Sequence, residues 1–413
     1  MYKHDVVPGP LDQCQICGSD HLSLVIDLGH QPLCDALLDD NQLNGIEVSY
    51  PLRLLQCDEC SLAQLDYVVD GDQVYPPEYP YRAGISWTVV EAHRQMADDI
   101  VKRFGVGFCV DIGSNDGTLL GHFKKRGCEV LGFEPTDIAQ LAVESGIPTV
   151  QSFFHEDAVT DEIGPHKKAD IITLTNVFAH MATLGTVMEG ITTLLDRDGV
   201  LVIENHYLLD ILEQNQFDSI YHEHIRTYTL KSLMVLFDQY QMEIFDVERV
   251  PRYGGNIRVF VGWRHRHIIS HRVLELRTHE DEYNYPAAIA RFQHNARHAR
   301  HSFLRFLDSA NGSIAGCSAP GRASTMLNYF GVKREVDRLT WTGELHNSLK
   351  LGLYLPGSHI QVVPNTRLIE EQPDYVLKVC CLNSYARYRI FPSTRTSHAD
   401  TLLRFEENQW QVS

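Results

Sequence analysis

The feature that most constrains the fold is a segment in which an apolar run passes through a glycine turn into a helix. Residues 108–112 predict a buried strand, and residues 118–126 have the spacing of a helix. Gly113 and Gly117 allow positive φ angles and a close approach of a ligand to the backbone. Glu134 follows the next predicted strand, where a nucleotide-binding α/β unit places an acid on the ribose. The segment therefore predicts a ligand-binding strand–turn–helix.

Two acidic residues of this segment bear on which ligand binds. Asp111 ends the strand, and Asp116 lies just before the helix. A pyrophosphate site favours bare glycines, and carboxylates repel phosphate, so the loop favours a cationic ligand without phosphate. S-adenosylmethionine is the common ligand of that kind. A dinucleotide remains compatible with the spacing, and a strand–turn–helix without a ligand is the alternative.

Composition narrows the class of protein. The 413 residues exceed what one hydrophobic core usually holds and predict two or three domains. A net charge of −18 argues against nucleic-acid or anionic membrane partners, because such binding depends on Lys and Arg. The start lacks the apolar core of a signal peptide, and no apolar run is long enough to cross a bilayer. We expect a soluble, cytoplasmic protein without a disulfide framework.

Two Cys-x-x-Cys pairs predict a zinc site. Cys14 and Cys17 form the first pair, and Cys57 and Cys60 form the second. Each pair places two thiolates on one tight turn, and four sulfur ligands leave no position for water, so the metal is expected to be structural. Cys34 lies between the pairs as a fifth, unbound thiol. The remaining cysteines are expected to be buried hydrophobic residues, namely Cys109, Cys128, Cys317, Cys380 and Cys381.

The order of the predicted elements indicates the architecture. Residues 1–74 form a short, loop-rich module that needs its zinc to fold. The Tyr- and Pro-rich segment 75–82 is expected to be an extended loop, and helical spacing follows from 88 to 104. Strands then alternate with helices, with strands expected at 108–112, 129–133, 149–151, 170–175 and 199–204. This alternation predicts a parallel, doubly wound sheet, closed by a turn at 253–256 and a strand at 257–261.

A third unit follows a polar stretch. Residues 273–307 have few helix breakers and predict a solvent-exposed linking helix. Residues 313–324 again predict a strand that leads into a turn of small residues, and 325–330 a helix. This turn carries Arg322 and no acid, so backbone N–H groups and the guanidinium favour a phosphate. A tight turn without a ligand is the alternative.

The densest cluster of proton-transfer groups is Tyr221-His222-Glu223-His224. Histidine accepts protons near neutral pH, and a neighbouring carboxylate increases its basicity. A metal site is less favoured because the spacing differs from that of helical zinc ligands, and a polar helix start is the alternative without chemistry. His180 follows the strand at 170–175, at the carboxyl edge where ligands bind in open α/β sheets.

Together, these motifs resemble the nucleotide-sugar C-methyltransferases of deoxysugar biosynthesis over nearly the whole chain. The resemblance rests on the zinc knuckles, the Tyr/Pro loop and the segments 111–117, 176–180, 221–224 and 355–360. It implies an α/β protein with three domains. These are a zinc-binding domain at 1–74, a Rossmann-like methyltransferase domain at 75–265, and a Rossmann-like domain for the sugar nucleotide at 266–413.

The resemblance also implies a reaction and its residues. The substrate would be a nucleoside-diphosphate 4-keto-6-deoxyhexose, methylated at carbon 3 after a base removes the proton next to the ketone. His224 is the expected base, with Glu223 and Tyr221 alongside. The residues expected to orient the sugar or stabilise the enolate are Tyr75, Tyr79, His180 and His222.

Both binding sites can be assigned in the same way. The residues expected to bind S-adenosylmethionine are Asp111, Gly113, Asn115, Asp116, Glu134, Pro135, Phe153, Phe154 and Asn176. The residues expected to bind the sugar nucleotide are Tyr81, Arg82, Asn205, Asn256, Ala319, Pro320, Arg322, Ser324, Lys350, Tyr354 and His359. The chain departs from the family at Arg322, where Lys is more usual, and at Tyr253, where His is more usual.

Other functions remain open at this point. The same base would also serve methylation of another carbon or of a carbonyl compound that is not a sugar. A binding protein whose methyltransferase domain has lost activity is a third possibility. We expect a small-molecule substrate and a monomer or weak dimer.

Overall fold

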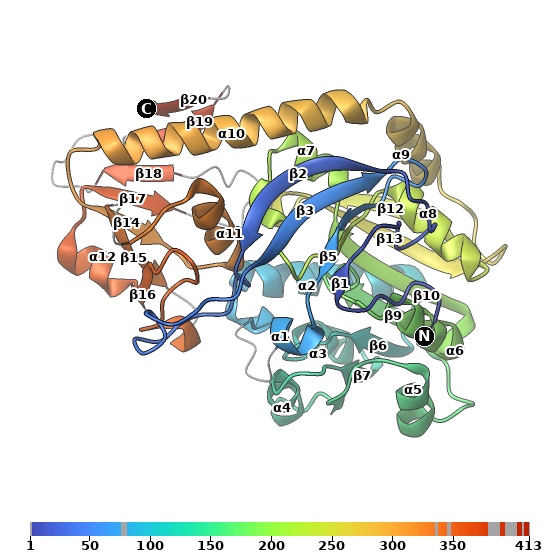
Figure 1. The fold of residues 1–413 in the computed structure, drawn as a ribbon. Helices are drawn as coiled ribbons and strands as arrows, with labels where there is room; N and C mark the ends of the chain where they lie inside the picture. The colour runs from blue at the N-terminus through green and yellow to red at the C-terminus, as the bar shows by residue number, and fades with distance from the viewer. Residues whose placement is uncertain are drawn as a thin grey trace.

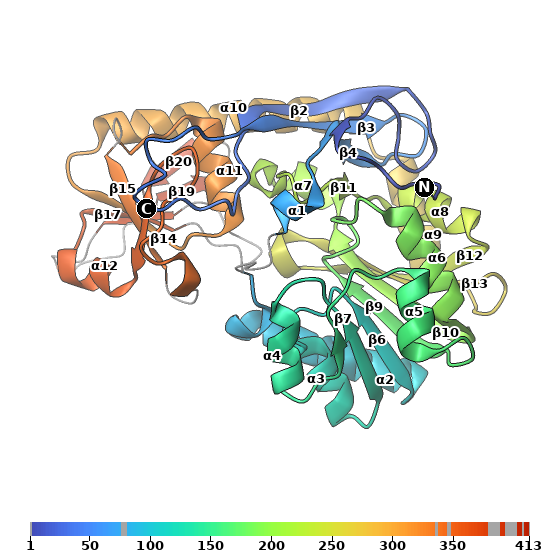
Figure 2. The same ribbon diagram turned by 60° about the horizontal axis from the view of Figure 1, so that its bottom comes forward.

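The computed structural model describes residues 2–75, 81–334, 338–344, 348–378, 389–392, 403–406 and 409–412. Three larger sheets make up the fold, and the chain passes from one to the next as the ribbon changes from blue through green to red (Figures 1 and 2). The N-terminal ribbon extends from the central sheet towards the C-terminal one in both views. Within the described residues, no helix is long and apolar enough to cross a membrane.

The N-terminal part is an antiparallel sheet in the order β11-β4-β3-β2. Its strands are β2 (Leu22–Gln31), β3 (Tyr50–Cys57), β4 (Ala63–Leu65) and β11 (Arg226–Thr227). A two-stranded sheet and a short helix accompany it, namely β1 (Gly9–Pro10), β5 (Tyr67–Val68) and α1 (Gly71–Val74). Because β11 comes directly after the Tyr-His-Glu-His segment, the N-terminal sheet holds that segment through main-chain pairing with β4.

The central sheet has seven strands in the order β12-β13-β10-β9-β6-β7-β8. These are β6 (Phe108–Ile112), β7 (Glu129–Phe133), β8 (Thr149–Val150), β9 (Ala169–Thr175), β10 (Leu195–His206), β12 (Met242–Val250) and β13 (Asn256–Trp263). The expected strands at 108–112 and 129–133 are therefore confirmed. The expected closing strand at 257–261 is present as β13, which runs antiparallel to both of its neighbours in an otherwise mainly parallel sheet.

Helices cover both faces of this sheet, as a doubly wound fold requires. The helices are α2 (Trp87–Phe104), α3 (Thr118–Lys125), α4 (Ile138–Glu144), α5 (Glu156–Ile163), α6 (Leu184–Leu194), α7 (Leu208–Glu213) and α8 (Leu230–Gln239). Successive residues of β6 face opposite ways: Val110 packs in the core with α5, α6 and α8, and Cys109 in the core with α2 and α3. Short 3-10 turns occur at η1 (Ala83–Ile85), η2 (Phe217–Ser219) and η3 (Arg252–Gly254).

The polar stretch after the central sheet is not the exposed linking helix predicted from its composition. It forms two helices, α9 (His271–Asp281) and α10 (Tyr285–Ser309). Asn284 caps α10, with its side chain accepting from the Ala287 N–H, and Pro286 lies in the first turn. One side of α10 is buried, at Ala288, Phe292, Ala296, Ala299, Phe303 and Leu307. These apolar residues recur at helical spacing between the charged ones, so α10 is part of a core.

The C-terminal sheet has the order β16-β15-β14-β17-β18-β19-β20, of which the first four strands are parallel. Its strands are β14 (Ile314–Cys317), β15 (Leu339–Glu344), β16 (Gln361–Pro364), β17 (Tyr375–Lys378), β18 (Arg389–Pro392), β19 (Leu403–Glu406) and β20 (Gln409–Val412). Its helices are α11 (Gly321–Phe330), η4 (Ser348–Lys350) and α12 (Thr366–Glu371). Helix α11 begins four residues earlier than expected, which places Arg322 inside the helix.

Candidate functional site

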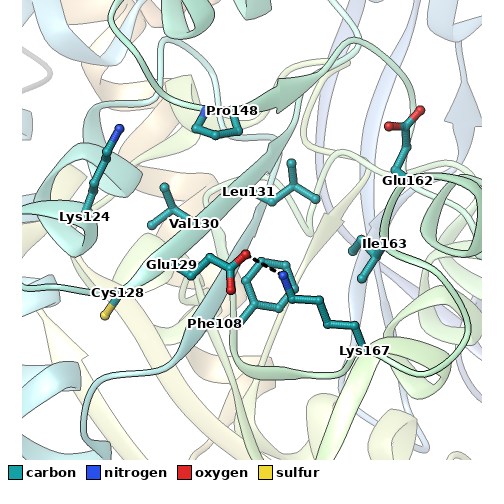
Figure 3. A pocket seen from close by; sticks show the side chains of 10 residues that line it. All are labelled: Phe108, Lys124, Cys128, Glu129, Val130, Leu131, Pro148, Glu162, Ile163 and Lys167. Atoms are coloured by element: carbon teal, nitrogen blue, oxygen red, sulfur yellow. Dashed lines mark hydrogen bonds and ion pairs between the residues drawn. The ribbon is translucent and has the colours of Figure 1, made fainter.

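A cavity of about 780 Å³ runs along the carboxyl edge of the central sheet. All three parts of the chain line it: Tyr75 near the N-terminal sheet, the loop after β6, the Tyr-His-Glu-His segment, and Lys350 beyond α11. A second cavity, of about 380 Å³, lies at the opposite, amino ends of β6 and β7 (Figure 3). Lys167 pairs with Glu129 there, and no residue predicted to act in catalysis or binding lines it.

One end of the large cavity is built by residues 113–117, the loop predicted from sequence to bind the methyl donor S-adenosylmethionine. We call these residues the donor loop, and this end of the cavity the donor end. Gly113 has φ 71°, and a Cβ there would lie 2.6 Å from the Val177 side chain, so only glycine fits the turn. Glu134 accepts hydrogen bonds from the Asn115 N–H at 3.0 Å and the Thr136 hydroxyl at 2.7 Å. These bonds hold the carboxylate at the cavity wall beside the turn.

Asp111 lies beneath this turn and is almost fully buried. Its carboxylate accepts a hydrogen bond of 2.6 Å from the Thr173 hydroxyl. Burial raises the pKa of Asp111 to about 7, and the charge of Glu134 adds to the shift. A cationic ligand beside these two carboxylates, of the kind predicted from the sequence, would favour the ionised form of Asp111.

Asp116 plays a different part from the predicted cofactor contact. It does not line the cavity: its carboxylate accepts from the Gly84 N–H at 2.7 Å and from the Thr118 hydroxyl at 2.6 Å. Asn115 accepts from the Ala83 N–H at 2.8 Å and donates to the Tyr81 carbonyl at 3.1 Å. The two side chains therefore fasten segment 81–86 over the donor loop.

The other predicted cofactor residues also line the cavity. They are Gly113, Asn115, Glu134, Pro135, Phe153, Phe154 and Asn176. Phe154 packs edge-on against Phe133 in the core, whereas Phe153 is 57% exposed. Asn176 has φ 55° and accepts a hydrogen bond from Asn256 at 3.1 Å.

Three imidazoles meet at the middle of the cavity. The ring centroid of His224 lies 4.9 Å from that of His180 and 4.7 Å from that of His206. His180 follows β9 and His206 ends β10, so both come from the carboxyl edge of the sheet. Burial lowers the pKa of all three histidines, to about 4 for His224, so they are neutral near pH 7.

Two tyrosines flank these histidines. The Tyr75 hydroxyl lies 2.7 Å from Nδ1 of His180, and the ring centroid of Tyr221 lies 4.1 Å from that of His224. Burial raises the pKa of both phenols, and the charge of Glu223 raises it further, so each keeps its O–H as a donor. Tyr79, predicted alongside them, lies outside the described residues.

His222 and Glu223 face the N-terminal part of the chain. Nε2 of His222 lies 3.2 Å from the carbonyl oxygen of Pro51, which can only accept, so His222 donates to strand β3. Glu223 Oε1 lies 3.6 Å from the Cys34 sulfur. Both side chains still line the cavity.

Arg322 reaches the cavity from α11. Its guanidinium is bonded to a carboxylate and is not free to bind phosphate in the way predicted. Its guanidinium makes a bidentate pair with Asp218, with Nη2 2.9 Å and Nε 3.1 Å from the two carboxylate oxygens. It also donates to the Tyr253 carbonyl at 3.2 Å and to Gln216 at 3.3 Å. These bonds direct the charge towards the histidines, where Arg322 contributes to the lowered pKa of His206 and His224.

Several other predicted substrate residues have partners elsewhere. Tyr354 donates to Asp40 at 2.7 Å, and His359 pairs with Glu47 at 2.5 Å, so the 355–360 loop rests on the N-terminal module. Tyr81, Pro320, Arg322 and Lys350 line the cavity. The candidates that do not line it are Arg82, Asn205, Asn256, Ala319, Ser324, Tyr354 and His359.

The sequence prediction missed several residues in and beside the cavity, four of which bear on the site. These are Cys34, which contacts Glu223, and Asp35, His206 and Arg252, which line the wall. The position of His206 at the end of a predicted strand was a usable signal. Arg252 and Arg258 pair with the buried Glu204: burial by itself would raise the pKa of this carboxyl, but the two guanidinium groups hold it at about 2. The cluster of Glu204 with its two arginines can be recognised only from the fold.

The four knuckle cysteines form a separate centre. Their sulfur atoms lie within 4.8 Å of one another, with 3.5 Å between Cys14 and Cys60 and 3.5 Å between Cys17 and Cys57. Tetrahedral zinc with bonds of about 2.3 Å requires sulfur–sulfur distances of about 3.8 Å, so the set fits zinc. Cys34 lies apart from these four, in a group with Asp35 and Glu223.

Comparisons with known proteins agree with this arrangement. Three family models match in order along the chain: "Putative zinc binding domain" at residues 14–75, "Methyltransferase domain" at 91–247 and "C-methyltransferase C-terminal domain" at 251–381. The C-methyltransferase NovU of Streptomyces niveus is 29% identical over 378 residues, which cover 89% of each chain.

Solved structures align over smaller parts of the chain. A methyltransferase of Aquifex aeolicus has 14% identity and a TM-score of 0.33, covering 42% of this chain and 97% of its own. Magnesium protoporphyrin IX methyltransferase of Synechocystis with bound S-adenosylhomocysteine has 15% identity and a TM-score of 0.33, covering 42% and 84%. At such scores, these two alignments carry no weight.

The assignment rests on the order and span of the three family matches, the full-length relative and the four-cysteine centre. The chain belongs to the S-adenosylmethionine-dependent C-methyltransferases that carry an N-terminal zinc-binding domain.

Proposed function

We propose that this enzyme methylates carbon 3 of a nucleoside-diphosphate 4-keto-6-deoxyhexose, with His224 as the base. The observation that carries the proposal is one cavity that joins the donor loop, three neutral imidazoles and the C-terminal domain. A volume of about 780 Å³ is in the range of sites for small organic ligands. We further propose that the enzyme is cytoplasmic and that its domains meet at residues 74/75 and 265/266.

Methylation of carbon requires a carbanion-like nucleophile. A ketone acidifies the neighbouring C–H because the negative charge spreads onto its oxygen, so the protein must supply a base for the proton and donors for the enolate oxygen. Bound S-adenosylmethionine supplies an electrophilic methyl group. The remaining work, which is to orient the sugar, remove the proton and stabilise the enolate, falls to this chain's side chains.

His224 is suited to the role of base. Its Nδ1 lies 2.6 Å from the Ser219 carbonyl oxygen, which accepts only, so Nδ1 carries the proton and Nε2 has the free lone pair. A pKa of about 4 keeps the ring neutral near pH 7, and negative charge that develops on the substrate favours its protonation. Tyr75, Tyr221 and His180 supply donors around the same point.

Three cations in the cavity wall favour a polar, anionic portion of the substrate. Lys350, Arg322 and Arg252 all line the cavity, and Lys350 is nearly buried although it carries a charge. Arg322 is bonded to Asp218 and Lys350 to Asp35, so a substrate phosphate would share either cation with a carboxylate. The three cations are each paired with a carboxylate, whereas Asp111 and Glu134 at the donor loop have no such cation beside them among the described residues, as a cationic donor there would favour.

A substrate panel tests the proposal. The purified enzyme is incubated with donor carrying a labelled methyl group and with thymidine- and uridine-diphosphate 4-keto-6-deoxyhexoses, and the position of the label is determined by NMR. We expect label on carbon 3. Label on another carbon would replace the carbon 3 assignment, and failure with every keto sugar despite donor binding would favour a carbonyl compound that is not a sugar.

A further inference from the structure

A buried thiol of the N-terminal module contacts the Tyr-His-Glu-His segment. The Cys34 sulfur lies 3.6 Å from Oε1 of Glu223, within the range of a hydrogen bond that involves sulfur, and both side chains are buried. Cys34 also packs against the start of α11, where a Cβ on Gly321 would lie 2.9 Å from its sulfur. All three parts of the chain therefore meet at this thiol.

The neighbouring charges are arranged to leave Glu223 as the acceptor. Asp35 follows Cys34 in the chain, and Lys350 Nζ lies 2.7 Å from its carboxylate and 3.1 Å from the Ala319 carbonyl oxygen. The ammonium thus compensates the second carboxylate of the cluster, which would otherwise repel Glu223. Asp35 and Lys350 both line the cavity.

The same three side chains invite comparison with a metal site. The ligand atoms of Cys34, Asp35 and Glu223 lie within 4.8 Å of one another. However, Lys350 already brings a positive charge to Asp35, and a second cation there would be repelled. Burial and the charge of Glu223 raise the pKa of Cys34, which favours the neutral thiol, a donor, over the thiolate that metals bind.

We propose that Cys34 is a positioning residue: its S–H donates to Oε1 of Glu223 and fixes the orientation of that carboxylate in the cavity wall that Tyr75 and Tyr221 also line. A carboxylate close to a phenol disfavours phenolate, so the two tyrosines stay protonated and able to donate to an enolate oxygen. The catalytic consequence rests on the proposed function. The effect of Cys34 on the orientation of Glu223 is independent of the proposed function.

Three variants test the role of the thiol. Cys34→Ala removes the donor, Cys34→Ser keeps a donor of similar size, and Cys128→Ala deletes a buried thiol at the distant cavity of Figure 3 as the control. Loss of one hydrogen bond to a charged group corresponds to about a tenfold effect. We expect Cys34→Ala to lower kcat about tenfold, with unchanged KM for S-adenosylmethionine. Cys34→Ser is expected to recover most of the rate, and Cys128→Ala to match wild type.

Two further readouts do not depend on activity. Metal analysis should give one zinc per chain for wild type and Cys34→Ala alike, and a crystal structure of Cys34→Ala should show the Glu223 carboxylate rotated away from its wild-type orientation. The proposal is overturned if Cys34→Ala contains less metal than wild type, or if its Glu223 carboxylate keeps the wild-type orientation. So does a Cys34→Ser variant as slow as Cys34→Ala, since that result indicates packing. If wild type methylates no keto sugar nucleotide, the proposed function fails, and the crystal structure still decides the positioning role.

Discussion

Nδ1 of His224 lies 2.6 Å from the carbonyl oxygen of Ser219, so the fold determines which ring nitrogen holds the proton. The carbonyl belongs to η2, five residues earlier in the chain, and the turn between them brings the ring back over it. Nε2 is thereby left to accept a proton from a substrate.

If His224 is the base, His224→Asn should lose proton abstraction but keep donor binding. We expect exchange of the sugar proton with solvent deuterium to fall by about 10²- to 10⁴-fold. The Kd of S-adenosylhomocysteine should stay within about twofold of wild type, because the donor loop is untouched. NMR measures the exchange and calorimetry the binding, with His122→Asn on α3 as the control outside the cavity. Exchange at the wild-type rate would rule out His224.

Much of the fold could be predicted because local patterns determine local structure. The apolar run before Asp111, the glycine turn and the strand before Glu134 are encoded in neighbouring residues, and β6 and β7 have the predicted bounds. The direction of β13 could not be predicted, because antiparallel and parallel strands can have the same pattern when both faces are buried.

The site was harder to predict where a side chain's partner lies far along the chain. Asp116 occupies a position in the motif that predicts a ligand contact, yet its carboxylate accepts a hydrogen bond from the N–H of Gly84, 32 residues earlier. Arg322 follows a phosphate-loop pattern, yet it bonds to Asp218, 104 residues away. Spacing within a motif carries no information about such contacts, and only the packing of the three sheets reveals them.

Zinc removal should unfold the N-terminal module. Cys57→Ala deletes one of four ligands, and a structural zinc site contributes about 10–16 kcal/mol in small domains. We expect insoluble protein, or soluble protein without zinc and with a lower melting temperature. Metal analysis and thermal melting measure both effects, and Cys128→Ala is the matched control, since it removes a buried thiol that is not a ligand. A stable, fully active Cys57→Ala protein without zinc would contradict a structural role.

Donor affinity should rise with pH through the titration of Asp111. Burial raises its pKa to about 7, so the unliganded protein loses stability as pH rises from about 4, the unfolded pKa, to 7. A cationic donor recovers that loss, so its Kd should fall by up to about tenfold per pH unit below 7. Calorimetry from pH 5.5 to 8 measures this. Asp111→Asn should flatten the profile, and Asp137→Asn, at the exposed start of α4, should not. A wild-type Kd independent of pH would contradict the prediction.

The Arg322 charge should shift the acid limb of the pH–rate profile, whose position depends mainly on the burial of His224. The Arg322 charge contributes to lowering the pKa of His224, so a neutral residue at this position should raise that pKa and move the acid limb of kcat/KM to higher pH. Arg322→Gln alone leaves the Asp218 carboxylate buried without its partner, which costs about 3–5 kcal/mol of stability.

The double variant Arg322→Gln/Asp218→Asn separates these two effects. It removes both charges together, so we expect it to fold better than Arg322→Gln. The acid limb should then move less, because loss of the negative charge of Asp218 acts on His224 in the opposite direction. Arg300→Gln on α10, whose guanidinium bonds to the Phe330 carbonyl outside the cavity, is the control for removal of a cation. An acid limb at the wild-type pH in Arg322→Gln would show that the base titrates out of reach of this charge.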